Sequence, residues 1–207
     1  MAYRVLIVDD QKMQRKALEA FLKESELFEV VETLGSAELA VTFCQNTKID
    51  LILMDVVMVN GMGGIEAAAR IKKQNSKVKV ILVTSMPEVS YLKRAKDAGV
   101  DSLWYKEYEE QPILEVMRRT MEGESIYPNT TPEILLGNAS SVELTEREID
   151  VLRKVITGAT DQEIAEALHI SMWTARSHLQ HILQKTGYKN RVELAVKARI
   201  AGVVIDE

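Results

Sequence analysis

The stretch Ile49-Asp50-Leu51-Ile52-Leu53-Met54-Asp55 decides the fold. Its residues from Leu51 to Met54 are all apolar, which indicates a strand buried on both faces, as in a parallel sheet covered by helices. The run ends in a carboxylate, Asp55. Because ligands bind at the carboxyl ends of the strands in open parallel sheets, we expect Asp55 to lie at a functional edge.

The same pattern of a strand followed by a helix recurs on both sides of this stretch. Strands are predicted over residues 3–8, 28–33, 49–54, 78–83 and 100–105, and helices over 11–24, 36–45, 64–74, 87–98 and 112–122. This alternation predicts an α/β fold, a flavodoxin-like doubly wound sheet of five parallel strands with right-handed crossovers. We therefore expect residues 1–122 to form one domain.

Periodicity disappears over residues 123–142, where Gly, Ser, Pro, Asn and Thr accumulate. This composition predicts a linker, with a short helix over 132–136. Residues 143–207 are expected to form an all-α domain of four short helices. Each of the four has a sequence signal for its start: the capping boxes Thr145-Glu-Arg-Glu148 and Thr160-Asp-Gln-Glu163, and the N-cap residues Ser171 and Asn190.

Composition limits the classes of protein that this chain can belong to. The 207 residues are 46% hydrophobic, enough for two modest cores, and the single cysteine, Cys44, excludes a disulfide framework. No apolar run approaches the ~20 residues of a membrane span, and no signal-peptide pattern precedes the first strand. We expect a cytoplasmic protein that does not enter a membrane.

Charge is distributed unevenly in a chain with a net charge of −5. Residues 171–199 carry six Lys and Arg against the single acid Glu193, whereas residues 143–170 carry more acids than bases. The protein is therefore not expected to coat nucleic acid by bulk attraction. A local basic surface in the last domain is expected instead.

Polar side chains end four of the predicted strands. Asp9 and Asp10 follow the first strand and Asp55 ends the third; these strands are neighbours in a 2-1-3-4-5 sheet, so three carboxylates converge. Clustered acids repel one another, and a hard divalent cation such as Mg²⁺ resolves that conflict. Thr84 and Lys106 follow the fourth and fifth strands, where they can contact phosphoryl oxygens. Asp55 would then be the nucleophile that accepts a phosphoryl group.

Residues 3–122 resemble the receiver domain of two-component response regulators, in which these five positions recur in this order. The resemblance implies that Asp10 and Asp55 bind Mg²⁺ together with the backbone carbonyl of Val57, and that Asp9 assists through water. It also implies that a sensor histidine kinase phosphorylates Asp55, and that Thr84 and Lys106 contact the phosphoryl group. Beyond self-phosphotransfer and autodephosphorylation at Asp55, we expect no enzyme activity.

Three features depart from the receiver pattern: a loop, Leu103, and Glu107, which follows Lys106 where many receivers carry a proline. The loop after Met58 reads Val59-Asn60-Gly61-Met62-Gly63-Gly64, without the usual proline and one residue longer. Leu103 stands where receivers commonly carry Tyr or Phe, and strand alternation directs the adjacent Trp104 to the opposite face. These departures leave open the alternative that the receiver is a phosphate-independent dimerisation or ligand-sensing module.

Residues 162–185 indicate a helix-turn-helix: a short helix, a tight turn at residues 169–171 and a longer helix. The packed side of the longer helix is expected to consist of Trp173, Ala175, Leu179, Ile182 and Leu183. On the outward side, base edges are within reach of Arg176, Ser177 and Gln180. Phosphate contacts are expected from Thr174, Lys185, Lys189 and Arg191.

Four segments of the last domain resemble the LuxR-type helix-turn-helix: Leu144-Thr-Glu-Arg-Glu-Ile-Asp-Val-Leu152, Glu163-Ile-Ala-Glu166, Ser171 with Thr174, Arg176 and His178, and Ile182 with Lys185. Joined to a receiver, such a domain resembles the NarL/FixJ family of response regulators. The resemblance implies a transcription regulator in which phosphorylation favours a homodimer on half-sites of double-stranded promoter DNA.

The last predicted helix has apolar residues that could serve domain packing or such pairing of copies. A competing hypothesis from another class is a Mg²⁺-dependent aspartyl phosphatase. That enzyme would need a general acid close after its nucleophile, whereas Val56 and Val57 follow Asp55.

Overall fold

A computed structural model describes residues 2–58, 61–85, 88, 90–106, 112–129 and 132–204. The chain divides into two compact units, with the main division at Thr130. The first unit contains a five-stranded sheet of order β2-β1-β3-β4-β5 in which all pairs are parallel. Its strands are β1 (Tyr3–Val8), β2 (Phe28–Leu34), β3 (Leu51–Asp55), β4 (Lys79–Thr84) and β5 (Ser102–Tyr105). The predicted doubly wound α/β fold is confirmed.

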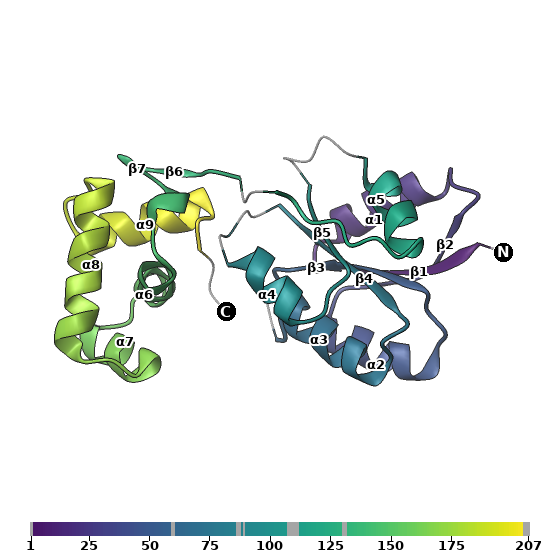
Figure 1. Ribbon diagram of the computed structural model, residues 1–207, viewed down its shortest axis with the longest axis horizontal. Helices are drawn as coiled ribbons and strands as arrows, with labels where there is room; N and C mark the ends of the chain where they lie inside the picture. The colour runs from purple at the N-terminus through teal and green to yellow at the C-terminus, as the bar shows by residue number, and fades with distance from the viewer. Residues whose placement is uncertain are drawn as a thin grey trace. The chain divides into compact units, whose positions relative to one another are not determined.

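Helices cover both faces of this sheet (Figure 1). On one face lie α1 (Lys12–Leu22) and α5 (Ile113–Met121), and on the other α2 (Ala37–Asn46), α3 (Gly64–Gln74) and α4 (Tyr91–Asp97). Consequently every residue of β3 is buried, as its apolar run predicted. The predicted start of the fourth helix at Pro87 lies outside the described residues.

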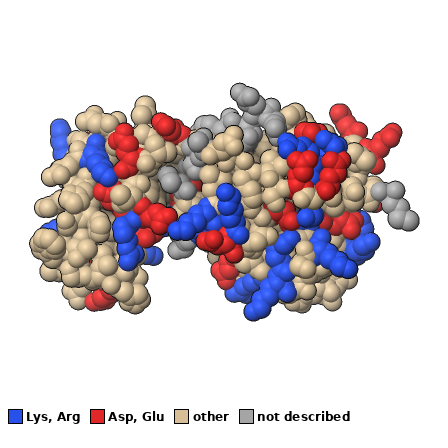
Figure 2. Space-filling view, in the orientation of Figure 1, with Lys and Arg blue, Asp and Glu red and all other residues tan. Residues whose placement is uncertain are grey.

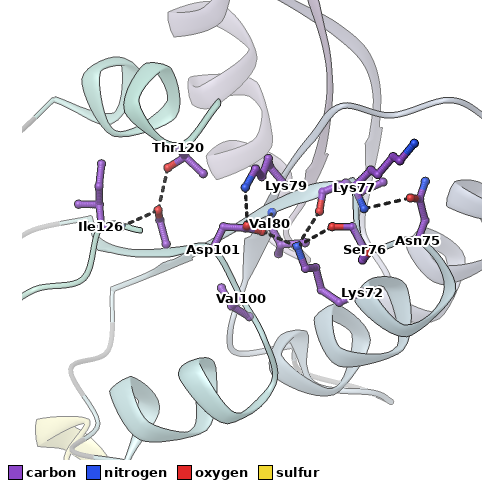
Figure 3. Close-up of polar contacts among 12 residues, drawn as sticks. Lys72, Asn75, Ser76, Lys77, Lys79, Val80, Val100, Asp101, Thr120 and Ile126 are labelled. Atoms are coloured by element: carbon purple, nitrogen blue, oxygen red, sulfur yellow. Dashed lines mark hydrogen bonds and ion pairs between the residues drawn. The ribbon is translucent and has the colours of Figure 1, made fainter. Parts of the chain in front are cut away.

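The edge strand β5 is anchored at its start and along its outer side (Figure 3). Asp101, just before β5, accepts hydrogen bonds from Lys72 Nζ at 2.8 Å and from Lys79 Nζ at 2.9 Å. On the outer side, the Ile126 amide donates to the Ser102 hydroxyl at 3.0 Å, and the Leu103 amide donates to the Ile126 carbonyl at 2.9 Å. Residues that the sequence assigns to a linker therefore satisfy the backbone of the sheet edge.

The other part of the predicted linker belongs to the second unit. The short helix predicted over residues 132–136 is wrong: β6 (Leu135–Leu136) pairs antiparallel with β7 (Ala139–Ser140). Gly137, with φ +66°, and Asn138 form the two-residue connection that favours a hairpin. Leu136 is part of the core of this unit, and Ala139 is also buried. The hairpin is followed by a short 3₁₀ helix, η1 (Ser141–Glu143).

Four α-helices complete the second unit, as predicted: α6 (Glu146–Ile156), α7 (Asp161–Leu168), α8 (Met172–Thr186) and α9 (Arg191–Ala201). Both predicted capping boxes are formed, and the side chains of Ser171 and Asn190 cap α8 and α9. Local sequence signals thus set all four helix starts. Among the residues described in both units, no helix is long and apolar enough to cross a membrane.

Gly64 provides a test of the packing that holds β3 against α3. A Cβ atom at this position would lie 1.8 Å from the carbonyl oxygen of Asp55, so we expect Gly64→Ala to force the backbone apart. The free energy of unfolding of the receiver-like unit, measured in urea by circular dichroism, should fall by about 1–3 kcal/mol. Gly63→Ser is the matched control, since its Cβ would meet only the Val56 carbonyl at 3.9 Å and Ser is a favoured N-cap residue. Equal loss in both variants would contradict the prediction.

Candidate functional site

Lys106 brings two predicted site residues together at the carboxyl edge of the sheet. Its Nζ atom lies 2.8 Å from Asp9 Oδ2 and 3.2 Å from Asp55 Oδ1. The side chains of Lys106, Asp9 and Asp55 are only 12%, 2% and 8% exposed, so water screens these charges weakly. Residues from the ends of β1, β3 and β5 therefore form one charged cluster.

Two further predicted residues adjoin this cluster through the backbone. Thr84 is buried at the end of β4, and its carbonyl accepts the Lys106 amide at 2.9 Å. The Val57 amide donates to Asp55 Oδ2 at 3.1 Å. The parallel register of β4 and β5 thus places Thr84 beside the strand end that carries Lys106.

The cluster changes the ionisation of Asp55. Burial raises the pKa of Asp55 to about 7, the charge of Lys106 opposes that rise, and the negative charges of Asp9 and Asp10 add to it. Burial alone would lower the pKa of the Lys106 ammonium, but the Asp55 and Asp9 carboxylates outweigh it and hold that pKa above its ordinary value. Negative charge at this edge therefore exceeds what Lys106 neutralises.

This excess of negative charge fits a hard divalent cation. Within the described ranges, no three His, Cys, Asp or Glu side chains are arranged to hold a metal ion by themselves. Mg²⁺ does not require such a set, because it binds through one or two carboxylates and keeps several waters. The donor atoms available here, carboxylate and backbone carbonyl oxygens, are the kind that Mg²⁺ prefers.

Glu38 is a residue near the site that sequence reasoning missed. Its Oε1 atom accepts the Met62 amide at 2.5 Å, which ties the loop after Asp55 to the start of α2. This bond is the main reason that the pKa of Glu38 is lowered. Gly61 has φ +86°, and a Cβ there would lie 2.2 Å from Glu38 Oε1. Val59 and Asn60, also in the unusual loop, lie outside the described residues.

Leu103 and Trp104 point to opposite faces of β5, as strand alternation predicts. Leu103 is buried, whereas Trp104 is partly buried against the core that includes β1, β3 and α5 residues. The Trp104 ring is therefore on the α1 and α5 face of the sheet.

In the second unit, α8 presents a polar stripe to solvent. Ala175, Leu179 and Ile182 are buried as predicted, and Arg176 and Gln180 are exposed. The expectation that Trp173 packs in the core is wrong, because 77% of this residue is exposed. Positions two apart on a helix point in nearly opposite directions, so burial of Ala175 turns Trp173 outward, onto the stripe of Arg176 and Gln180.

The predicted phosphate-binding residues differ in their surroundings. Lys185 Nζ lies 2.7 Å from Glu148 Oε2, a buried carboxylate, and donates to the Glu143 carbonyl at 2.9 Å. Arg191 forms an ion pair with Asp161, and the Thr174 hydroxyl is hydrogen-bonded to the Ser171 hydroxyl. Ser177, which was predicted to reach base edges, is half-buried. Lys189 is exposed. Acidic and basic side chains both occur on each unit in the view of Figure 2, so contacts with an anionic partner would depend on individual cations.

Comparison with protein families identifies both units. The response regulator receiver domain matches residues 5–118, and the LuxR family of bacterial regulatory proteins matches residues 142–198. The chain belongs to the two-component response regulators that join a receiver to a LuxR-type helix-turn-helix domain. It is therefore a DNA-binding response regulator of the class that regulates transcription.

Individual relatives agree with this assignment. The chain is 37% identical over 206 residues to the response regulator protein VraR of Staphylococcus epidermidis, with 96% of this chain and 97% of the relative covered. It is 35% identical, with the same coverage, to VraR of Staphylococcus aureus.

Solved structures of lower identity share the fold. A structure of two RcsB dimers bound to two parallel DNAs has a TM-score of 0.62 at 18% identity and covers 99% of this chain and 100% of its own. RcsB from Salmonella enterica serovar Typhimurium, bound to promoter rprA with a phosphomimetic, has a TM-score of 0.63 at 20% identity. That match covers 94% of this chain and 98% of the other.

The raised pKa of Asp55 predicts a pH dependence of stability. The folded state retains a proton on Asp55 up to about pH 7, whereas the unfolded state releases it near pH 4, so this stabilisation is present below pH 4 and lost as pH rises through 7. Asp55→Asn cannot ionise. Its stability relative to wild type should therefore rise between pH 4 and pH 8, by on the order of 1–4 kcal/mol.

This difference is measured by urea unfolding at a series of pH values without divalent cations. Asp97→Asn, at an exposed position on α4, is the control and should show no such rise. A constant difference between Asp55→Asn and wild type across this range would contradict the raised pKa.

Proposed function

We propose that this response regulator is switched by phosphorylation of Asp55, which a sensor histidine kinase carries out, and that the phosphorylated form binds promoter DNA as a homodimer. The observation that carries the proposal is the contact of Lys106 with both Asp9 and Asp55 at the ligand-binding edge of the sheet. A buried carboxylate beside a buried ammonium suits transfer of an anionic group onto the carboxylate.

The chemistry follows from the residues in contact. An oxygen of ionised Asp55 attacks the phosphorus of a phosphohistidine, the phosphorus–nitrogen bond breaks, and the released imidazole takes up a proton from water. Lys106 then exchanges its contact with the Asp55 carboxylate for one with a phosphoryl oxygen. Thr84, at the end of β4, donates a hydrogen bond from its hydroxyl to another phosphoryl oxygen.

Mg²⁺ is the proposed cofactor. Asp10, Asp55 and the carbonyl of Val57 would hold it, with Asp9 contributing through water. When bound, the ion supplies positive charge that offsets the charge of the phosphoryl donor. Burial and the acidic neighbours raise the pKa of Asp55, and the positive charge of a bound ion would lower it, which would favour the ionised form that attacks.

The output is DNA binding through α8. We assign Arg176, Ser177 and Gln180 to base edges, and Thr174, Lys189 and Arg191 to phosphates. Trp173, exposed on the same stripe, adds an apolar surface suited to thymine methyl groups. Lys185 was predicted to contact phosphate, but its ion pair with Glu148 favours a role within the domain.

A second copy of the chain is the proposed partner on DNA. Val192, Val196 and Ile200 are spaced by four along α9 and are 70%, 51% and 77% exposed. Such a stripe of exposed apolar side chains suits pairing with an identical helix. A solved structure with this fold is described as two RcsB dimers bound to two parallel DNAs, which supports pairing of copies on DNA.

The phosphorylation proposal is tested with Mg²⁺ and acetyl phosphate. We expect wild type, but not Asp55→Ala, to gain the mass of one phosphoryl group, to shift toward a dimer in light scattering, and to bind DNA more tightly. Asp97→Ala, exposed on α4, is the control and should behave as wild type. Wild type that binds DNA without gaining phosphate would favour a phosphate-independent receiver. Sustained release of free phosphate from many donors would favour a phosphatase.

A second test asks which of two lysines, Lys185 or Lys189, contacts a DNA phosphate. Lys185→Ala leaves the buried Glu148 carboxylate without a cation, held only by its capping-box bonds to Thr145. The free energy of unfolding should therefore fall by about 1–3 kcal/mol, while the salt dependence of DNA binding is unchanged. Lys189→Ala should leave stability unchanged and reduce the slope of log K against log salt by about 0.9. The reverse outcome would mean that Lys185 is the phosphate contact.

A further inference from the structure

Asp161, the first residue of α7, holds two arginines of the DNA-facing surface. Its Oδ2 atom accepts from Arg176 Nε at 3.1 Å, and its Oδ1 atom accepts from Arg191 Nη1 at 2.8 Å. We propose that Asp161 is a positioning residue that orients Arg176 toward guanine and so helps to set the base preference of this protein. The proposal rests on the proposed role of α8 in DNA binding.

The geometry of arginine explains why this contact matters. A guanidinium has five N–H donors in a fixed plane, and guanine offers two neighbouring acceptors, O6 and N7, in the major groove. Because Nε of Arg176 is engaged by Asp161, the two terminal amino groups are left for an end-on, paired contact with the base. The Arg176 side chain is 58% exposed, so these groups can reach a partner outside the domain.

Asp161 is itself held firmly enough to act as a support. It begins a helix whose capping box, Thr160 with Glu163, is formed, and a carboxylate is favoured at a helix amino terminus. Arg191 is fixed from a second side, because it also donates to the Ala159 carbonyl. Burial opposes ionisation of Asp161, but the hydrogen bonds and charges of Arg176 and Arg191 outweigh it and lower its pKa. The carboxylate therefore remains charged at neutral pH.

Positioning and simple stabilisation predict different effects on DNA binding. A carboxylate near the DNA repels phosphates whatever the sequence, so its removal should not weaken binding to arbitrary duplexes. An arginine released from its support must be ordered on binding, and it can also turn toward phosphates, so discrimination between bases should fall. An ion pair at this exposed surface that served stability alone would contribute little and leave base preference unchanged.

The experiment is selection of bound sequences from a pool of random-sequence duplex DNA by the full-length protein. Wild type should enrich a guanine that Arg176→Ala no longer enriches. Asp161→Ala should reduce the enrichment of that same guanine by about tenfold, retain the preferences at the other positions, and bind unselected duplex at least as tightly as wild type. Glu166→Ala is the matched control. Glu166 is an acid of the same helix, but its carboxylate accepts from Gln162 and not from Arg176, so this variant should retain the enrichment of guanine.

Each outcome has a distinct meaning. Asp161→Ala that enriches the guanine as strongly as wild type overturns the positioning role, as does an equal loss in Glu166→Ala. If wild type enriches no sequence, or Arg176→Ala keeps the guanine, the proposed base contact itself is wrong. Circular dichroism checks folding. Should Asp161→Ala fail to fold, Asp161→Asn, which keeps the size but can support only one arginine through its oxygen, is judged by the same reduction in guanine enrichment.

Discussion

The receiver site depends on one interaction, the pair of salt bridges that Lys106 forms with Asp9 and Asp55. These three side chains are nearly buried, so a displaced ammonium would leave two carboxylates repelling each other at low dielectric. Lys106 follows β5, a strand of four residues at the edge of the sheet. Such a strand holds Lys106 in place only if it is fixed at both sides. Asp101 fixes its start through Lys72 and Lys79, and Ile126 bonds along its outer side.

The sheet and the site at its edge could be predicted from the sequence, because the order of strands in a parallel sheet determines which strand ends are neighbours. Once the apolar runs are recognised, residues at strand ends must share one edge, whatever connects them. The contribution of Ile126 could not be predicted in this way. Its bonds to β5 use backbone groups, which every residue type has, in a segment whose composition is that of a linker. Glu38 was missed for a similar reason, because a carboxylate that accepts a backbone amide has no sequence period.

In the helix-turn-helix unit, capping residues predict where helices begin, whereas hydrophobicity alone does not predict which face of a helix a side chain lies on. The capping residues predicted all four helix starts, since a cap bonds to a neighbour three residues away. Trp173 was assigned to the core on its hydrophobicity, although the burial of Ala175 requires the opposite face. Ion pairs across helices, such as Lys185 with Glu148, depend on rotamers and on helix packing, so the one-dimensional charge pattern did not reveal them.

These ion pairs explain how an acidic protein can present a selective cationic surface. With a net charge of −5, the chain as a whole does not attract DNA, so specificity must come from a few cations in fixed positions. The acids around α8 fix the direction in which each of these cations points. Glu148 turns Lys185 toward the domain, whereas Asp161 engages one side of Arg176 and leaves its exposed end to face a partner. The same arrangement occurs at the receiver edge, where Asp9 and Asp55 fix the Lys106 ammonium. In both units, buried or partly buried carboxylates therefore decide where a cation points.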